Sequence, residues 1–221
     1  MELNNFLREK EVAGAVFDMD GTLTSSMQGW KNIYACLERL LNVKLPPDFM
    51  MRVNHLPMKE RVEVIANQFS LNIDIAKIYP QWLNFALGYY RDVFKIKPYM
   101  SDVLASFRAA GLPMAIATAS DGLCAQAFIK GNNLEGYFAA VTSLSEVSRP
   151  KSFPDIYLLT AKKIGVAPSH CLVFEDALEP LSGAKSGGFL ICGVQDDASA
   201  ADEVQIRRIS DLTLGFPARN F

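Results

Sequence analysis

The stretch Ala13-Gly14-Ala15-Val16-Phe17, followed at once by Asp18-Met19-Asp20-Gly21-Thr22, decides the fold of this chain. The first five residues form a short, continuously apolar run that stops at Asp and Gly, which is typical of a buried strand. In an open parallel sheet, ligands bind beyond the carboxyl ends of the strands. Two carboxylates at such an end need a cation, a proton or hydrogen-bond donors, because an unpaired buried charge is costly. The stretch therefore predicts a metal-assisted reaction on an anionic substrate.

Four further apolar runs resemble buried strands, and stretches with helical spacing of their apolar residues separate them. The predicted strands cover residues 113–118, 139–142, 170–175 and 189–194. The predicted helices cover residues 101–110, 122–131, 155–164 and 180–186. Strands that alternate with helices are typical of a parallel sheet whose two faces are covered. The sequence therefore predicts an α/β fold with a Rossmann-like, doubly wound parallel sheet.

The segment between Thr24 and Phe94 contains no strong strand candidate. Its apolar residues follow helical spacing over residues 30–41, 58–69 and 74–90. We expect the third helix to be interrupted or redirected near Pro80, because proline removes a backbone donor. This pattern predicts a small α-helical domain of residues 25–94, inserted into a core domain of residues 1–24 and 95–221. Two crossings would join the domains, and two crossings can act as a hinge.

The composition argues against several classes of partner. A formal net charge of −2 over 221 residues gives no electrostatic reason to expect nucleic acid or an anionic membrane surface. No apolar stretch reaches transmembrane length, and Met1–Lys10 lacks the apolar segment of a secretory signal. The four cysteines are widely spaced and include no Cys-x-x-Cys pair, so we interpret them as reduced thiols. We therefore expect a cytoplasmic protein that binds neither nucleic acid nor membrane.

Reactive groups also follow other predicted strands. One strand ends in Thr118-Ala119-Ser120-Asp121, where small side chains would let backbone N–H groups approach an anion close to a helix start. Lys151 lies just before a helix that follows Pro154, and a second acidic pair, Glu175-Asp176, ends another strand. Alone, an acidic pair often caps a helix and a lone lysine is usually solvated. Four such groups in order at strand ends favour one shared site.

Taken together, these residues resemble the haloacid dehalogenase-like hydrolase superfamily over about residues 13–212. The motifs that carry the resemblance are Phe17-Asp18-Met19-Asp20-Gly21-Thr22-Leu23, Thr118, Lys151 and Val173-Phe174-Glu175-Asp176. The helical insert between the first two motifs resembles the helical cap of one subfamily. Within it, the pattern is similar to sugar-phosphate phosphatases and beta-phosphoglucomutases. The resemblance implies a Mg²⁺-dependent enzyme that hydrolyses a small phosphorylated metabolite, and we expect it to be a monomer.

The resemblance also implies roles for the acidic motif residues. Asp18 would attack phosphorus as the nucleophile and form an aspartyl-phosphate. Asp20 would protonate the leaving alkoxide and then activate water. The Mg²⁺ ion would contact Asp18, the backbone carbonyl of Asp20, Asp176 and, directly or through water, Glu175.

A second group of residues is implied to bind the phosphoryl group. Lys151, the Thr118 hydroxyl and the Ala119 N–H would hold its oxygens and stabilise their charge in the transition state. Gly21 belongs to the same predicted phosphate-binding set. In the cap, His55 is predicted to contact a substrate hydroxyl.

Other cap residues have two possible roles or a solvent-facing one. Trp30 and Tyr34 would either pack within the cap or contact the substrate. We expect three basic residues on a solvated helix face: Arg52, Lys59 and Arg61.

The chain departs from the family pattern at several positions. Thr24-Ser25-Ser26 replaces a common Asp-Ser or Asp-Thr pair, and Ser152 stands where a proline commonly follows the lysine. Trp30 occupies the place of a histidine that the mutases carry in the first cap helix. The absence of that histidine favours hydrolysis over phosphoryl transfer between sugars.

Two alternatives to a phosphatase stay open from the sequence. One is a phosphomutase of the beta-phosphoglucomutase type, and the other is a catalytically idle protein that binds a phosphorylated metabolite. The retained Asp18, Asp20, Lys151 and Asp176 argue against the idle protein. Haloacid dehalogenation is less favoured, because two acidic pairs suit metal-assisted phosphoryl chemistry.

Overall fold

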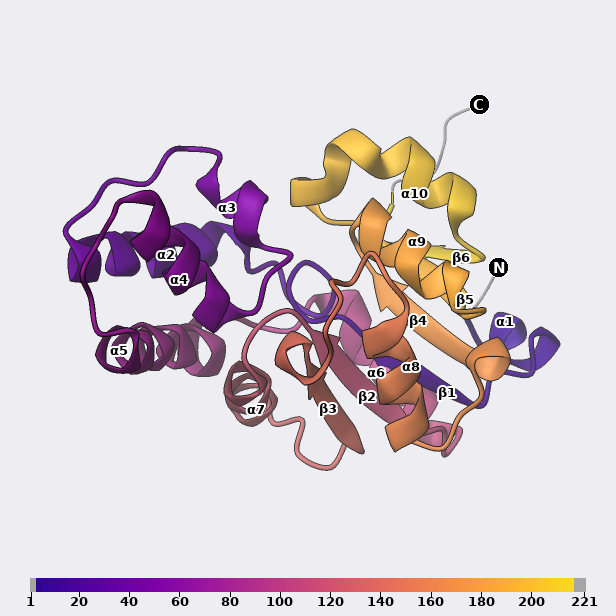
Figure 1. The fold of residues 1–221 in the computed structure, drawn as a ribbon. Coiled ribbons are helices and arrows are strands. Elements are labelled where there is room, and N and C mark those ends of the chain that lie inside the picture. The colour runs from indigo at the N-terminus through magenta and orange to yellow at the C-terminus, as the bar shows by residue number, and fades with distance from the viewer. Residues whose placement is uncertain (1–2, 217–221) are drawn as a thin grey trace.

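The computed structural model describes residues 3–216 and contains one six-stranded sheet with helices around it (Figure 1). The strands are β1 (Gly14–Phe17), β2 (Met114–Thr118), β3 (Ala140–Ser143), β4 (Cys171–Glu175), β5 (Leu190–Val194) and β6 (Leu212–Leu214). All neighbouring strands pair in parallel, in the order β3-β2-β1-β4-β5-β6. This is the strand order of the doubly wound fold, so the predicted α/β class is confirmed.

Helices cover both faces of the sheet. One face packs against α1 (Leu3–Glu9), α6 (Pro98–Ala109) and α7 (Gly122–Gly131). The other face packs against α8 (Asp155–Lys163), α9 (Leu178–Ser186) and α10 (Glu203–Ile209). Short 3₁₀ turns lie at η2 (Leu144–Glu146), η3 (Pro168–His170) and η4 (Asp197–Asp202). Because side chains alternate along a strand, Phe17 joins the first hydrophobic cluster and Val16 joins the second.

Phe17 anchors the centre of the sheet, immediately before the first acidic residue. It lies opposite Ile116 of β2 and Phe174 of β4 in the parallel register. Its ring stacks on the Phe174 ring with centroids 4.4 Å apart, and the Phe107 ring meets it edge-on at 5.9 Å. Such aromatic contacts add stabilisation beyond the buried area. The strand end that carries Asp18 is therefore firmly fixed.

The segment between β1 and α6 is helical throughout its regular parts, as predicted. It contains α2 (Met27–Leu41), α3 (Phe49–Val53), α4 (Met58–Gln68), α5 (Ile75–Gly88) and a π-helical turn, η1 (Tyr89–Val93). The predicted interruption at Pro80 is wrong, since α5 continues through it. Pro80 is the sixth residue of α5, where its missing N–H removes one hydrogen bond within the helix. Trp82 of α5 donates to the Ile33 carbonyl of α2 at 2.8 Å and joins the two long helices.

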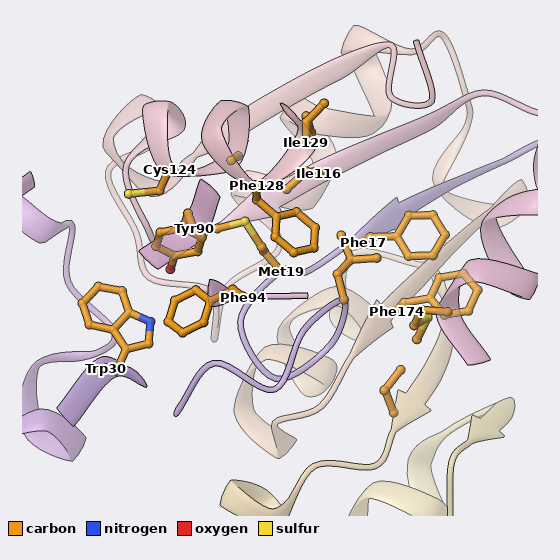
Figure 2. Packing of buried hydrophobic residues seen from close by; sticks show 14 of the residues in the cluster. Phe17, Met19, Trp30, Tyr90, Phe94, Ile116, Cys124, Phe128, Ile129 and Phe174 are labelled. Carbon is orange, nitrogen blue, oxygen red and sulfur yellow. The ribbon is translucent and has the colours of Figure 1, made fainter. Parts of the chain in front are cut away.

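Two neighbouring linkers connect the helical insert to the sheet: the first covers residues 18–26, between β1 and α2, and the second covers residues 94–97, between η1 and α6. Thr24 of the first linker forms a bridge with Ile96 of the second, and the Lys97 N–H donates to the Leu23 carbonyl at 2.8 Å. The first hydrophobic cluster also continues from the sheet into the insert, through Met19, Phe94, Tyr90 and Trp30 (Figure 2). The division into two domains at residues 24/25 and 94/95 stays a prediction.

The Lys97 side chain, in the second linker, contacts the two loops that follow β1 and β5. Its buried ammonium donates to the Gln195 carbonyl at 2.7 Å and to the Gly21 carbonyl, and it pairs with Asp196 at 3.0 Å. Gly21 belongs to the loop of the first acidic motif, so this lysine ties the linker to that loop. Among residues 3–216, no helix has both the length and the apolar character of a membrane span.

Candidate active site

Two strand ends and one loop bring four charged side chains together. Asp18 follows β1, Glu175 ends β4 and Asp176 follows it, and Lys151 comes from the loop before α8. The Lys151 ammonium donates to Asp18 Oδ1 at 2.6 Å and to the Ala117 carbonyl at 3.1 Å, and it forms a close ion pair with Glu175. All four charged side chains are buried. Three segments that are far apart in the sequence thus converge on one point.

The three carboxylates form a group that could hold a metal ion. One oxygen from each of Asp18, Glu175 and Asp176 lies within 4.8 Å of the others. Asp176 Oδ1 accepts a hydrogen bond from the Thr22 hydroxyl at 3.0 Å. Asp18 Oδ2 is buried and has no hydrogen-bond partner among residues 3–216. A buried carboxylate oxygen without a donor is unfavourable, so this atom is available for a cation or an electrophile.

The electrostatics of the group indicate a surplus of negative charge. Burial, with the charge of Glu175, raises the pKa of Asp18 to about 7, although Lys151 counteracts the rise. Burial, with the charges of Asp18 and Glu175, also raises the pKa of Asp176. Burial alone would lower the pKa of Lys151, but the two neighbouring carboxylates outweigh it and hold this pKa above its ordinary value. One lysine does not balance three carboxylates, and these hard oxygen donors fit a divalent cation.

Tyr157 supports the three carboxylates, and no pattern in the sequence indicates this role. Its hydroxyl donates to Glu175 Oε1 at 2.9 Å, and the Lys151 ammonium lies 5.6 Å from the centre of its ring. Glu175 Oε2 accepts from the Asp176 N–H at 3.2 Å. Both oxygens of Glu175 are therefore occupied, which orients this carboxylate toward Lys151. In the sequence, Tyr157 is one of several apolar residues on the buried face of a helix.

Gly21 allows the Asp176 carboxylate to approach the first motif. Its φ is +99°, in the region that favours glycine, and an added Cβ would lie 2.4 Å from Asp176 Oδ2. The Gly21 N–H donates to the Thr24 carbonyl at 2.8 Å. Gly21 thus acts here by leaving space, and its predicted contact with phosphate stays a prediction.

The loop after β2 presents the predicted phosphate-binding residues. Thr118 is fully buried at the end of the strand, and its Oγ1 accepts from the Ser120 N–H at 3.0 Å. Asp121 caps α7 by accepting from the Leu123 N–H at 2.9 Å. Ala119 lines the same cavity as Asp18 and Lys151. The loop therefore lies beside the acidic group with a helix N-terminus behind it.

Asp20 lies outside the three-carboxylate group and has its own set of donors. Its carboxylate accepts from the Tyr90 hydroxyl at 2.7 Å to each oxygen, from the Ser120 hydroxyl at 2.7 Å and from Trp30 Nε1 at 3.2 Å. Tyr90 and Ser120 lie 70 and 100 residues from Asp20 in the sequence, and neither was identified there as a partner of Asp20. The predicted metal contact of the Asp20 backbone carbonyl stays a prediction.

Comparison with known proteins now assigns the family. A family model of the haloacid dehalogenase-like hydrolases matches residues 12–188, which is most of the chain. This chain belongs to that family. The predicted membership is confirmed.

Several relatives of this hydrolase act on phosphorylated compounds. Fructose-1-phosphate phosphatase YqaB of Escherichia coli is 27% identical over 80% of this chain and 93% of its own length. A phosphoglycolate phosphatase of the same species is 28% identical over 81% of this chain and 79% of its own. The solved structure of CbbY from Rhodobacter sphaeroides in complex with phosphate has a TM-score of 0.79 at 21% identity, and covers 92% of this chain and 93% of its own. The structural likeness confirms the fold.

A cavity of about 600 Å³ opens between the helical insert and the acidic group of this hydrolase. Asp18, Asp20 and Lys151 lie on its sheet side. Trp30, Tyr34, His55 and Arg61 line it from the insert. His55 is exposed on this wall, so its predicted contact with substrate stays a prediction.

The expectation that Arg61 lies on a solvated helix face is wrong. Its side chain is buried, and its guanidinium donates to the Leu56 carbonyl at 2.9 Å and the Asn54 carbonyl at 3.1 Å. It also donates to the Tyr34 hydroxyl at 3.3 Å and lies 5.3 Å from the Trp30 ring. The loop before α4 folds back over the arginine, which helical spacing alone could not indicate. Arg52 and Lys59 are exposed, as expected.

Proposed function

We propose that this hydrolase is a Mg²⁺-dependent phosphatase that cleaves a small phosphomonoester, such as a sugar phosphate, through an aspartyl-phosphate. The observation that carries the proposal is the buried pair of Asp18 and Lys151 at the cavity. There, one oxygen of Asp18 is held by the lysine and the other has no donor among the described residues. The names of the relatives, which act on fructose 1-phosphate and on phosphoglycolate, support this substrate class.

The three-carboxylate group supports the choice of metal. Asp18, Glu175 and Asp176 would hold Mg²⁺, which prefers hard oxygen ligands. When bound, the ion supplies positive charge that favours the ionised form of Asp18 and polarises the phosphoryl oxygens. Lys151, the Thr118 hydroxyl and the Ala119 N–H would hold the remaining oxygens of the transferring group.

Two displacements complete the proposed reaction. In the first, a carboxylate oxygen of Asp18 forms a bond to phosphorus while the ester P–O bond breaks, and Asp20 gives its proton to the leaving oxygen. In the second, Asp20 takes a proton from water, the water oxygen bonds to phosphorus, and the bond to Asp18 breaks. Inorganic phosphate is released and both aspartates return to their starting forms.

We also propose that the enzyme is cytoplasmic and monomeric and that it binds neither nucleic acid nor membrane. The four cysteines are free thiols, which suits a reducing compartment. The size of the cavity suits a metabolite better than a macromolecule.

Hydrolysis is favoured over phosphoryl transfer between sugars by the residue beside Asp20. Trp30 stands at the place of the mutase histidine and donates its indole N–H to Asp20 at 3.2 Å. An indole N–H is a hydrogen-bond donor only, so it cannot act as a general acid or base at neutral pH as an imidazole can. A phosphomutase remains the alternative outcome of the test below.

A phosphate-release panel tests the proposed function. Fructose 1-phosphate, glucose 6-phosphate, phosphoglycolate and para-nitrophenyl phosphate are incubated with the protein in Mg²⁺ or in EDTA. We expect Mg²⁺-dependent release that Asp18→Asn abolishes, whereas Asp102→Asn, an exposed carboxylate on α6, leaves it unchanged. No release from any compound would refute the phosphatase. Conversion of beta-glucose 1-phosphate to glucose 6-phosphate with a bisphosphate primer would indicate the mutase instead.

A further inference from the structure

We propose that Tyr90 is a positioning residue for the reaction: it holds the Asp20 carboxylate where that group can give its proton to the leaving oxygen. This role rests on the proposed function. Tyr90 lies in the π-helical turn η1, far from the acidic motifs in the sequence. Tyr90 is buried, its hydroxyl contacts Asp20, and it lies just before the second linker.

The hydroxyl of Tyr90 contacts both oxygens of one carboxylate. It lies 2.7 Å from Asp20 Oδ1 and 2.7 Å from Asp20 Oδ2. The Ser120 hydroxyl lies 2.9 Å from the Tyr90 hydroxyl and 2.7 Å from Asp20 Oδ2, which closes a triangle of polar atoms. Hydrogen bonds at both oxygens restrict the rotation of the Asp20 carboxylate about its bond to Cβ. Its oxygens therefore keep a fixed direction relative to the cavity.

Packing fixes the tyrosine ring as well as its hydroxyl. Tyr90 is fully buried, its ring meets Phe94 edge-on at 4.9 Å, and Trp30 lies 6.3 Å away. Figure 2 shows the Tyr90 hydroxyl on the side of the ring where Trp30 and Phe94 lie. Burial, with the charge of Asp20, raises the pKa of the Tyr90 hydroxyl, so it keeps its proton and remains a donor.

The π-helical turn explains how a tyrosine from the insert reaches Asp20. Such turns insert an extra residue into a helix and often occur at functional sites. Here the turn buries Tyr90 while its neighbour Tyr89 stays partly exposed. Trp30 approaches Asp20 from α2, just after the first linker, and Tyr90 approaches from just before the second. Both ends of the insert thus hold the same carboxylate, so a shift of the insert would shift the proton donor.

A merely structural tyrosine and a positioning tyrosine differ in their dependence on the leaving group. A sugar alkoxide is a poor leaving group and needs a proton from Asp20, whereas para-nitrophenolate leaves without one. The value of kcat/KM covers the steps up to release of the leaving group. Removing the Tyr90 hydroxyl should therefore lower kcat/KM for a sugar phosphate much more than for para-nitrophenyl phosphate. A general structural defect would lower both values by the same factor.

The experiment compares Tyr90→Phe with Tyr89→Phe in the full-length protein with Mg²⁺. The sugar phosphate is fructose 1-phosphate, or the compound of the panel that the unchanged protein cleaves fastest. For Tyr90→Phe we expect a loss of about tenfold or more on the sugar phosphate and less than about threefold on para-nitrophenyl phosphate, a fraction of the full effect of general acid catalysis. Tyr89→Phe should leave both values unchanged, because no described residue forms a hydrogen bond with the Tyr89 hydroxyl.

A second variant separates the role from a folding defect. Ser120→Ala removes the other hydroxyl of the triangle and should shift the ratio of the two kcat/KM values in the same direction. In an Asp20→Asn background, Tyr90→Phe should produce no further change of the ratio, since the proton donor is already absent. Equal losses on both substrates, or no loss, would overturn the positioning role while the phosphatase stands. An unchanged protein that cleaves neither substrate would refute the proposed function, and this role with it.

Discussion

Asp18→Asn should stabilise the metal-free protein at neutral and alkaline pH, even though it removes the proposed nucleophile. The carboxylate lies among Glu175 and Asp176, and Lys151 is the cation that contacts it. Asparagine keeps the shape of the side chain, and its carbonyl can still accept from Lys151. Its amide also offers a donor in place of Asp18 Oδ2, the oxygen without a partner among residues 3–216.

The pKa of Asp18 sets the size of the expected gain. The value rises from 3.8 to about 7 in the folded protein, mainly through burial. At about 1.36 kcal/mol per unit, this rise corresponds to about 4 kcal/mol of lost stability once Asp18 is ionised in both states. The sign follows from proton binding: the folded protein holds this proton more tightly than the unfolded chain does. Stability of the unchanged protein therefore falls as pH rises from about 4 to about 7, through the Asp18 contribution.

Urea unfolding in EDTA over a pH series measures the effect. The difference in free energy of unfolding between Asp18→Asn and the unchanged protein should grow from near zero at about pH 4 to about 4 kcal/mol above pH 7. Added Mg²⁺ should reduce the difference, because the unchanged protein keeps all three carboxylates and binds the ion more tightly than the variant does. An ion that binds the folded protein stabilises it, and the gain grows with the logarithm of the ion concentration. Asp102→Asn, an exposed control, should show no pH-dependent difference. A variant that is less stable above pH 7, or a difference that does not change with pH, would show that the charge of Asp18 does not destabilise the metal-free protein.

Three further substitutions test other parts of the site. Lys151→Ala leaves two carboxylates without their cation, so we expect a loss of about 3–5 kcal/mol in the free energy of unfolding. Phosphate release should fall by about 100-fold or more. Near-normal turnover would contradict the proposed role of Lys151 in holding the phosphoryl group. Gly21→Ala places a Cβ against Asp176 and should weaken Mg²⁺ binding in calorimetry by about tenfold or more, and unchanged affinity would show that the carboxylate is free to move. Arg61→Leu leaves two carbonyls without their donor and should cost about 2–4 kcal/mol in urea unfolding, whereas Lys59→Leu on the exposed face should cost almost nothing; equal costs would contradict a loop-anchoring arginine.

The sheet could be predicted because its signals are local. Four of the strands (β1, β2, β4 and β5) are mainly apolar runs, and β3 begins with one; each of these five was predicted within about two residues. The three-residue β6 and the five-residue α3 are too short for any periodicity to appear in the sequence. α1 and α10 have seven residues each and were missed for the same reason. Pro80 misled because it removes only one hydrogen bond, while contacts such as that of Trp82 with the Ile33 carbonyl hold α5 against α2.

Residues of the site could likewise be predicted only where a local sequence pattern marks them. Asp18 and the pair Glu175-Asp176 stand at strand ends, so their convergence follows from the parallel sheet. Lys151 lies in the loop before α8, and its resemblance to a family motif indicated it. Tyr90 and Tyr157 act through contacts between distant segments, and nothing near them in the sequence distinguishes them from core aromatics. The burial of Arg61 comes from a loop that folds over it, and helical spacing carries no information about loops.

The adjacent linkers have a consequence for how such enzymes diversify. The chain leaves the sheet at Thr24 and returns at Ile96, and these two residues are paired with each other. The core is therefore connected to the inserted segment through the same two paired residues, however long that segment is. A replacement of the inserted helices could alter which compound is admitted while the phosphoryl chemistry stays intact. The geometry makes substrate choice a separable module, provided that the replacement again supplies a partner for Asp20.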